Sequence, residues 1–177
     1  MESITTIQPP RTIREVWDAL PEGTLAQIID NQLIMSPQPS DLHQEILNFI
    51  NVAIFLYVEK HSLGKVRIAP YGVYLDEENL FEPDLTFIRN ENLHKIRKNG
   101  LHGAPDLVIE VLSPSNAKYD KNQKKKIYER HGVKEYWIVD PETKEAQGFF
   151  LEDGTFGPPL KLVGKIASRV LDYEFEF

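Results

Sequence analysis

Residues 107–112 form a run in which apolar side chains occupy both odd and even positions, interrupted by one acid, Glu110. Strands that are apolar on both sides occur in the centre of a sheet whose two faces are covered. The run therefore predicts a central strand, in which Glu110 shares a face with Val108 and Leu112. A carboxylate buried there is strongly unfavourable unless a partner compensates it. Sequences keep such local inconsistencies mainly at functional sites.

Hydrophobic periodicity elsewhere predicts helices and strands without strict alternation. The predicted helices are 12–20, a long helix that begins at Ser40 or Asp41 and ends at Gly64, and 115–131, which ends at Gly132. The predicted strands are 25–29 and 32–35, joined by a tight turn, then 65–69, 72–75, 84–88, 107–112, 135–139, 146–151 and 173–177. A long polar loop is expected over residues 89–104. This mixture predicts one domain, residues 1–177, of the α+β or mixed α/β class.

A second acid stands at the start of another predicted strand, where Asp84 follows Pro83. If this strand lies beside strand 107–112, Asp84 and Glu110 can converge on one point. Two carboxylates, completed by water and a substrate phosphate, form the kind of site that Mg²⁺ usually occupies. Each acid also has an ordinary interpretation, Asp84 as a turn residue and Glu110 as a structural acid bonded to an arginine or the backbone.

Two further acids, Glu82 and Asp106, lie next to prolines and suit turn or surface positions. Asp106 also has the side-chain parity of Glu110, so it could approach the site from the start of the strand. His43 lies on the first turn of the predicted long helix and is a supporting candidate. Glycine spacing matches neither a dinucleotide-binding motif nor a P-loop, and no histidine pair has HExxH spacing.

The predicted helix 115–131 contains five lysines, and helical geometry distinguishes them. Residues at spacings of three and four form one stripe, which consists of Asp120, Lys124, Ile127, Tyr128 and His131. Because Ile127 and Tyr128 are expected to face inward, Lys124 is the lysine expected nearest the two acids. The alternative is an exposed i,i+4 pair of Asp120 and Lys124, worth about 0.3–0.5 kcal/mol.

Composition limits the class of protein. The chain of 177 residues has no cysteine, which excludes disulfides, thiolate metal sites and cysteine nucleophiles. No apolar run approaches the ~18 residues of a membrane span, and the N-terminal residues lack a signal-peptide core. We therefore expect a cytoplasmic protein that does not enter a membrane.

The net charge of −7 argues against a general nucleic-acid coat, but the charge is unevenly distributed. Residues 89–134 hold 11 Lys and Arg and 5 acids, a local charge of +6, which leaves −13 for the remainder. This segment is either a basic face that contacts phosphates or a solvated helix face followed by a charged loop.

These motifs occur in an order that resembles the Uma-two-type putative restriction endonuclease family. The residues that carry the resemblance are Pro83-Asp84, the run 107–115 (LVIEVLSPS), Asp120, Lys124, Tyr128 and the segment 132–141 (GVKEYWIVDP). The match also includes Leu20-Pro21-Glu22 and His43, and it covers nearly the whole chain. It implies the restriction-endonuclease-like fold of the PD-(D/E)XK nucleases, a mixed central sheet flanked by helices.

The resemblance also implies roles for individual residues. Asp84 corresponds to the metal-binding aspartate and Glu110 to the second acid of the motif. The lysine that usually follows two residues later would fall on Leu112, and the resemblance places it in the next helix, at Lys124. The family often has Glu where this chain has Gln27, so a supporting carboxylate is missing there.

The expected activity is Mg²⁺- or Mn²⁺-dependent hydrolysis of DNA phosphodiester bonds. The expected catalytic residues are Asp84, Glu110 and Lys124, with Asp84 and Glu110 as metal ligands and His43, Asp106 and Tyr128 in support. The residues expected to bind nucleic acid are Arg89, Lys95, Arg97, Lys98, Lys121 and Lys125. A homodimer is expected, with the apolar C-terminal tail as one source of contact. The alternatives are a catalytically inactive nuclease-fold module that binds nucleic acid or a protein, and a carbohydrate hydrolase that uses the same two acids.

Overall fold

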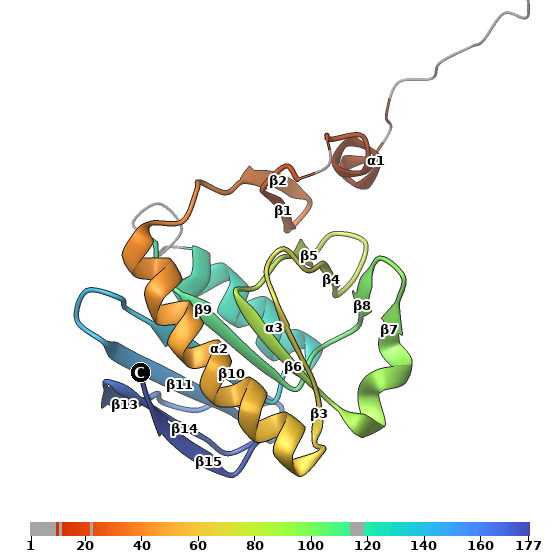
Figure 1. Cartoon of the computed structure of the whole chain (residues 1–177). Coiled ribbons are helices and arrows are strands. Elements are labelled where there is room, and N and C mark those ends of the chain that lie inside the picture. The colour runs from red at the N-terminus through yellow and green to blue at the C-terminus, as the bar shows by residue number, and fades with distance from the viewer. Residues whose placement is uncertain (1–9, 11, 22, 114–118) are drawn as a thin grey trace, which may run out of the picture.

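The computed structural model describes residues 10, 12–21, 23–113 and 119–177, and its core is a seven-stranded mixed sheet (Figure 1). The strand order is β12-β11-β10-β9-β6-β3, and β13 also pairs with β11. These strands are β3 (Gly64–Ile68), β6 (Leu85–Arg89), β9 (Leu107–Val111), β10 (Glu135–Val139), β11 (Glu145–Glu152), β12 (Thr155–Phe156) and β13 (Leu160–Val163). The expected mixed α/β fold is confirmed.

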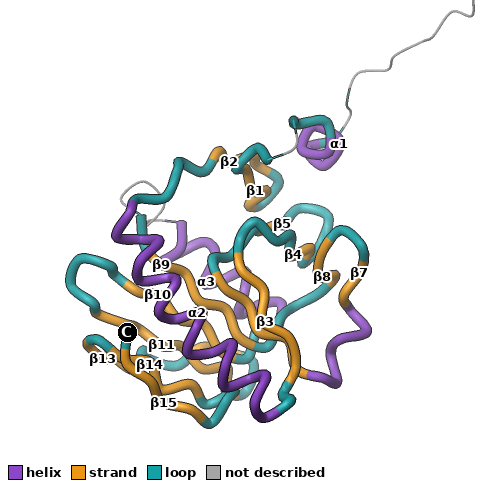
Figure 2. Tube along the Cα trace, viewed as in Figure 1, coloured by secondary structure: helices purple, strands orange, loops and turns teal. Residues whose placement is uncertain are grey.

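Two smaller sheets accompany the central one. The first has the order β2-β1-β5-β4-β8-β7, and the second pairs β14 with β15. Their strands are β1 (Ala26–Ile29), β2 (Gln32–Met35), β4 (Val73–Tyr74), β5 (Leu80–Phe81), β7 (Ile96–Arg97), β8 (Gly100–His102), β14 (Lys165–Ser168) and β15 (Tyr173–Glu176). The helical elements are α1 (Ile13–Asp18), α2 (Asp41–His61), the 3₁₀ helix η1 (Asn90–Lys95), the π-helical turn η2 (Tyr119–Lys124) and α3 (Lys125–His131). In Figure 2 the helices are purple and the strands orange.

Strand β9 lies in the middle of the sheet, as its apolar pattern predicts. It pairs in parallel with β10 and antiparallel with β6, and all five of its residues are buried. Leu107, Ile109 and Val111 belong to the core cluster that includes the inner side of α2. Val108 belongs to the cluster formed with α3, on the other face of the sheet. The two helices therefore cover opposite faces of β9, and the parity of Glu110 directs it toward α3.

Helix α2 begins where the sequence predicts and ends three residues before the expected terminator, Gly64. The Ser40 hydroxyl accepts a hydrogen bond from the His43 backbone N–H, which caps the first turn. The last helical residue is His61, and the C-cap residue Ser62 adopts a left-handed conformation with φ of 52°. Gly64 is instead the first residue of β3, where a Cβ atom would collide with the Ile88 carbonyl oxygen. Glycine is therefore required at position 64 because the backbone of β6 packs closely against it, and not because it ends the helix.

The segment predicted as a long loop, residues 89–104, contains η1, β7 and β8. Strands of two or three residues are too short to produce a periodic pattern, so the sequence did not indicate them. Leu101 in β8 is nevertheless fully buried, and β8 pairs in parallel with β4. The prediction of a long polar loop was wrong for this segment, because its short strands extend the smaller sheet.

The predicted helix 115–131 is also modified. Residues 114–118 lie outside the described part of the chain, and residues 119–124 form the wider π-helical turn before α3 begins at Lys125. This stretch is mostly polar, so its contacts, rather than an apolar stripe, determine its geometry. The Tyr136 hydroxyl donates a hydrogen bond to the Asp120 carbonyl oxygen at 3.1 Å. Gly132 ends α3 in a left-handed conformation, as predicted.

The apolar C-terminal tail packs against its own chain. Phe175 is buried in the core cluster beneath α2, and the Tyr173 ring stacks on the Tyr57 ring with 3.9 Å between centroids. The structure therefore corrects the expectation that the tail supplies a dimer contact, because most of its apolar surface is already covered. Across the described residues, no helix combines the length and the apolar character needed to cross a membrane.

Candidate active site

The pairing of β6 with β9 brings the two predicted acids together. Leu85 lies opposite Ile109 in this antiparallel pair, so the same register continued by one residue places Asp84 opposite Glu110. Residues directly opposite each other in an antiparallel pair point to the same face of the sheet. This register places the two acids next to each other where the end of β9 meets the start of β6, and both line the same cavity.

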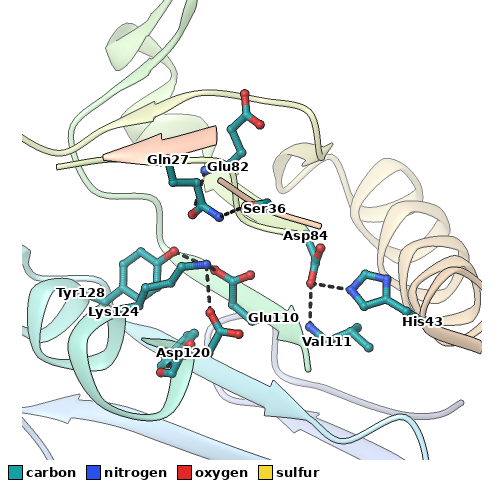
Figure 3. Close-up of polar contacts among 11 residues, drawn as sticks. Gln27, Ser36, His43, Glu82, Asp84, Glu110, Val111, Asp120, Lys124 and Tyr128 are labelled. Atoms are coloured by element: carbon teal, nitrogen blue, oxygen red, sulfur yellow. Dashed lines mark hydrogen bonds and ion pairs between the residues drawn. The ribbon is translucent and has the colours of Figure 1, made fainter. Parts of the chain in front are cut away.

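Asp84 is anchored through one of its two carboxylate oxygens (Figure 3). Its Oδ2 accepts the Val111 backbone N–H at 2.7 Å and lies 3.2 Å from Nε2 of His43. Burial alone would lower the pKa of His43, but the hydrogen bond and negative charge of Asp84 outweigh this effect and raise it. The first turn of α2 thus places an imidazole beside Asp84.

Glu110 is held by a buried cation and a phenol. The Lys124 Nζ lies 2.9 Å from Oε1 of Glu110 and 2.9 Å from Oδ1 of Asp120. The Tyr128 hydroxyl donates a second hydrogen bond to Oε1 of Glu110 at 3.0 Å. All four side chains are buried, so the interpretation of Asp120 and Lys124 as an exposed surface pair is wrong. Lys124 lies beside Glu110, where the helical stripe predicted it.

The pKa values of both Glu110 and Lys124 are raised in this cluster. Burial raises the pKa of Glu110 to about 8, because the charge of Lys124 offsets burial only in part and Asp120 and Asp84 add repulsion. Burial alone would lower the pKa of Lys124, but Asp120 and Glu110 outweigh it and raise the pKa. Lys124 therefore stays protonated, whereas Glu110 holds its proton more tightly than an ordinary carboxyl group does.

These groups open onto a cavity of about 320 Å³ that lies between the start of α2, the end of β9, η2 and the β1–β2 hairpin. Asp84, Glu110, Asp120, Lys124 and His43 all line it. Tyr128 lies behind Glu110 and contacts the cavity only through that side chain.

Two other cavity residues received no role from the sequence. Glu82 was assigned to a turn or the surface, yet it is half-buried in the cavity wall, and burial raises its pKa. Its position directly before Pro83-Asp84 was the available signal. Asp120 was considered only as a partner of Lys124, and spacing alone could not show that both are buried.

Gln27 occupies the part of the wall formed by the β1–β2 hairpin. Its Nε2 donates a hydrogen bond to the Ser36 hydroxyl at 3.1 Å, and its Oε1 accepts the Glu82 backbone N–H at 3.4 Å. The side chain is buried and lines the cavity. The neutral amide thus stands where the family resemblance suggests that a carboxylate is common.

Asp106 is not part of this cavity, which corrects the expectation drawn from strand parity. It precedes β9, whereas the cavity adjoins the other end of the strand. Its Oδ2 accepts the Arg89 backbone N–H at 2.8 Å, and both carboxylate oxygens accept hydrogen bonds from the Asn92 amide. The carboxylate therefore orders the chain before η1.

The basic residues expected to bind nucleic acid lie outside the cavity wall. The Arg89 guanidinium donates a hydrogen bond to the Val170 carbonyl oxygen at 2.9 Å, and the Lys125 Nζ lies 4.2 Å from the centre of the Phe149 ring. The Lys95 Nζ is 3.5 Å from the Ala104 carbonyl oxygen. The remaining three are exposed to solvent, and these are Arg97, Lys98 and Lys121.

Each of the two central acids keeps one oxygen free of hydrogen bonds to the described residues, Oδ1 in Asp84 and Oε2 in Glu110. Across the described residues, no group of three or more His, Asp or Glu side chains is arranged so that it could bind a metal ion without other ligands. Mg²⁺ usually binds through one or two carboxylates and keeps several waters. The pair of acids therefore fits a Mg²⁺ site completed by water and substrate.

The fold is restriction-endonuclease-like, a mixed sheet flanked by helices. The chain matches the Uma2 family, whose description is "Putative restriction endonuclease", over residues 15–163, and it belongs to that family. Its fold is similar to a crystal structure from Anabaena variabilis described as "a putative nuclease belonging to DUF820", with a TM-score of 0.72. That likeness has 16% sequence identity and covers 86% of this chain and 84% of the other. No curated protein matches the sequence.

Proposed function

We propose that this protein is an endonuclease that hydrolyses phosphodiester bonds of DNA and requires Mg²⁺ or Mn²⁺. One observation carries the proposal: Asp84 and Glu110 lie opposite each other on one cavity wall, with the buried ammonium group of Lys124 2.9 Å from Glu110. Membership of a family described as restriction endonucleases supports the choice of DNA as substrate.

The donor set suits a hard divalent cation. Asp84 and Glu110 would hold the ion through the oxygens that form no hydrogen bonds to the described residues. When bound, such an ion polarises the scissile phosphate and neutralises charge that develops in the transition state. Among the described residues, the cavity is lined by four carboxyl groups, those of Glu82, Asp84, Glu110 and Asp120, and by two basic side chains, Lys124 and His43. These carboxyl oxygens are the ligands that a hard divalent cation prefers.

Lys124 acts in this proposal as a fixed positive charge and hydrogen-bond donor. Because its pKa is raised, it stays protonated and does not accept a proton from water. Asp120 and Glu110 fix the position of its ammonium group, and Tyr128 fixes the Glu110 carboxylate. The ammonium group can then orient the attacking water or contact a phosphate oxygen.

Backbone phosphates outside the cavity would be bound by residues of the basic segment 89–134. Arg97 and Lys98 are exposed beside the β7–β8 turn, and Lys121 is exposed on the same turn as Asp120 and Lys124. Contacts of this kind position a duplex without reading its sequence. Arg89, Lys95 and Lys125 would contribute mainly to the local positive potential, since each also contacts a protein group.

The decisive test is the Glu110→Gln variant in a plasmid-nicking assay with millimolar Mg²⁺ or Mn²⁺. The amide keeps an oxygen acceptor for Lys124 and Tyr128, so we expect the fold to survive while cleavage is lost. The exposed Glu142 supplies a matched control, and Glu142→Gln should cleave like the original protein. Cleavage by the Glu110 variant at the original rate would refute the proposal.

A catalytically inactive nuclease-fold module that binds nucleic acid or a protein is the second candidate. The observation in its favour is Gln27, a neutral amide in the cavity wall where a further carboxylate would strengthen a metal site. Calorimetry separates the two candidates, because a vestigial site should bind neither Mg²⁺ nor Mn²⁺ at millimolar concentration. Heat of binding that disappears in Glu110→Gln would support the enzyme.

A further inference from the structure

The outer side of α2 exposes large apolar side chains. Phe49 is 52% exposed, Val52 47%, Phe55 46% and Leu56 61%. These positions recur at spacings of three and four, so the side chains form one continuous stripe along the helix. The inner side of α2 already supplies the core with Ile46, Ile50, Ile54 and Val58. A helix of this kind normally presents polar residues to water on its outer side, so the stripe calls for a partner.

Opposite charges flank the stripe at equal distances. Glu45 precedes it and Lys60 follows it, and both are exposed. Within the described part of the chain neither residue forms an ion pair, whereas the neighbouring Glu59 pairs with Lys65 at 3.6 Å. The midpoint between Glu45 and Lys60 falls between Val52 and Ala53. Phe49 and Leu56 are also equidistant from that midpoint.

This arrangement is self-complementary under a two-fold rotation. If two α2 helices pack antiparallel about an axis near Val52, Glu45 of each copy faces Lys60 of the other, and Phe49 faces Leu56. A parallel pair would instead place like charges together at both ends of the stripe. We propose that α2 is the dimer interface of this protein and that its partner is a second copy of the same chain, packed antiparallel. The proposal does not depend on the proposed nuclease activity.

The size of the stripe indicates how strong this dimer is. Four large side chains that are about half exposed offer on the order of 350 Å² per copy, within the range at which exposed apolar patches become functional. Stable interfaces bury about 800 Å² per partner, so flanking polar residues must supply the rest. We therefore expect a reversible dimer with a dissociation constant in the micromolar range.

The interface would also arrange the two candidate active sites. His43 lies on the first turn of α2 and contacts Asp84, so each cavity adjoins the beginning of its own helix. Each His43 is between nine and ten residues from the proposed axis. At a rise of 1.5 Å per residue, the two sites would be separated by about 28 Å along the helix direction. Figure 1 shows α2 on the near face of the molecule, with its first turn beside the end of β9.

Sedimentation equilibrium of the full chain without DNA or metal tests the interface directly. We expect the original protein to dimerise at micromolar concentration and Leu56→Glu to stay monomeric, with an unchanged circular dichroism spectrum because Leu56 is exposed. Glu45→Lys and Lys60→Glu should each weaken the dimer about tenfold or more, since each places like charges together twice. The double variant Glu45→Lys/Lys60→Glu should restore the original dissociation constant.

Two matched controls account for the change in net charge. Glu142→Lys and Lys126→Glu reverse exposed charges outside α2 and should leave the dissociation constant unchanged. A protein that is monomeric at all concentrations would overturn the proposal. The same holds if the double variant dimerises no better than the two single variants, because the charge pairing would then be absent.

Discussion

At the residue scale, Glu110 links the stability of this protein to its candidate metal site. Its carboxylate is buried beside two other acids, and its pKa rises to about 8 from an ordinary value of 4.5. The folded protein therefore keeps a proton that the unfolded chain has already released over this range. A cation that binds the carboxylate must displace that proton, so metal binding and folding both respond to pH.

Without a divalent cation, we expect the free energy of unfolding to fall as pH rises from about 4.5 to about 8. The contribution of Glu110 is fully present below its unfolded pKa and is lost as pH rises through its folded pKa. Urea unfolding in EDTA across this range measures the effect, and Glu110→Gln should flatten the curve. A residual slope of the same sign should remain, because the pKa values of His43 and Glu135 are also raised.

The same experiment with Mg²⁺ should show stabilisation that is larger at pH 8 than at pH 5, since the ion competes with the proton on Glu110. Glu142→Gln, which removes an exposed carboxylate, should follow the original protein in both conditions. If Mg²⁺ stabilises the protein equally at both pH values, Glu110 is not a ligand.

Gln27 offers a second prediction at this scale. In Gln27→Glu the Oε1 acceptor for the Glu82 N–H is kept, and the Ser36 hydroxyl can turn to donate to the new carboxylate. The added negative charge in the cavity wall should tighten Mn²⁺ binding about tenfold, equivalent to about 1.4 kcal/mol. Calorimetric titration measures the change. Gln32→Glu on the next strand of the hairpin lies outside the cavity and should have no such effect, and equal affinities for both variants would contradict a role for position 27.

At the scale of elements, the sequence predicted those helices and strands that are long and have a clear hydrophobic pattern. The double-sided apolar pattern of β9 and the spacing within α2 predicted both elements to within a few residues. The two-residue strand β4 lies inside the predicted strand 72–75, whereas β5 and β7 were not predicted, because no period is visible in so short a run. The π-helical turn η2 was predicted as part of an α-helix, because the local pattern gives no sign of the buried contact between Lys124 and Glu110.

The pairing of β11 with β10 depends on a glycine, Gly148, which leaves room for a tryptophan of β10. It lies opposite Trp137 in the β10–β11 pair, and a Cβ atom there would come within 2.5 Å of the indole ring. Trp137 is fully buried and cannot move aside without disturbing the core. We expect Gly148→Ala to lower the free energy of unfolding by about 1–3 kcal/mol in urea titrations.

Gly157→Ala is the matched control for this substitution, because no atom lies within 4 Å of its Cβ position. It should change the free energy of unfolding by less than about 0.5 kcal/mol. Similar effects of the two substitutions would show that the indole does not constrain β11.

At the scale of the whole molecule, the candidate site depends on contacts between segments that are distant in the chain. Asp84 and Glu110 were predicted because each breaks a local pattern, but their adjacency required the pairing of β6 with β9. Gln27 belongs to the site because the β1–β2 hairpin forms part of the cavity wall, and Glu82 because it directly precedes Pro83-Asp84. Asp106 shares the side-chain parity of Glu110, yet it lies at the opposite end of β9. Its carboxylate there accepts hydrogen bonds from the Arg89 backbone N–H and the Asn92 side chain. Parity alone gives the face of a strand and leaves the position along it undetermined.

The distribution of charge over the whole molecule leads to the last prediction. A net charge of −7 repels DNA, so binding must rely on the basic segment 89–134 and should weaken steeply as salt increases. Each phosphate contact contributes about 0.9 to the slope of log affinity against log salt. In the Glu110→Gln background, which prevents cleavage, the additional change Arg97→Ala/Lys98→Ala should reduce this slope by about 1.8. Fluorescence anisotropy at several salt concentrations measures it.

Lys161→Ala provides the control for this measurement, because Lys161 is exposed but lies outside the basic segment. Its removal should leave the slope unchanged, although the overall affinity will fall slightly through the loss of one positive charge. If Arg97→Ala/Lys98→Ala behaves in the same way, the β7–β8 turn does not contact phosphates. The DNA would then have to approach along η2, where Lys121 is exposed beside the cavity residues Asp120 and Lys124, and Lys121→Ala should reduce the slope instead.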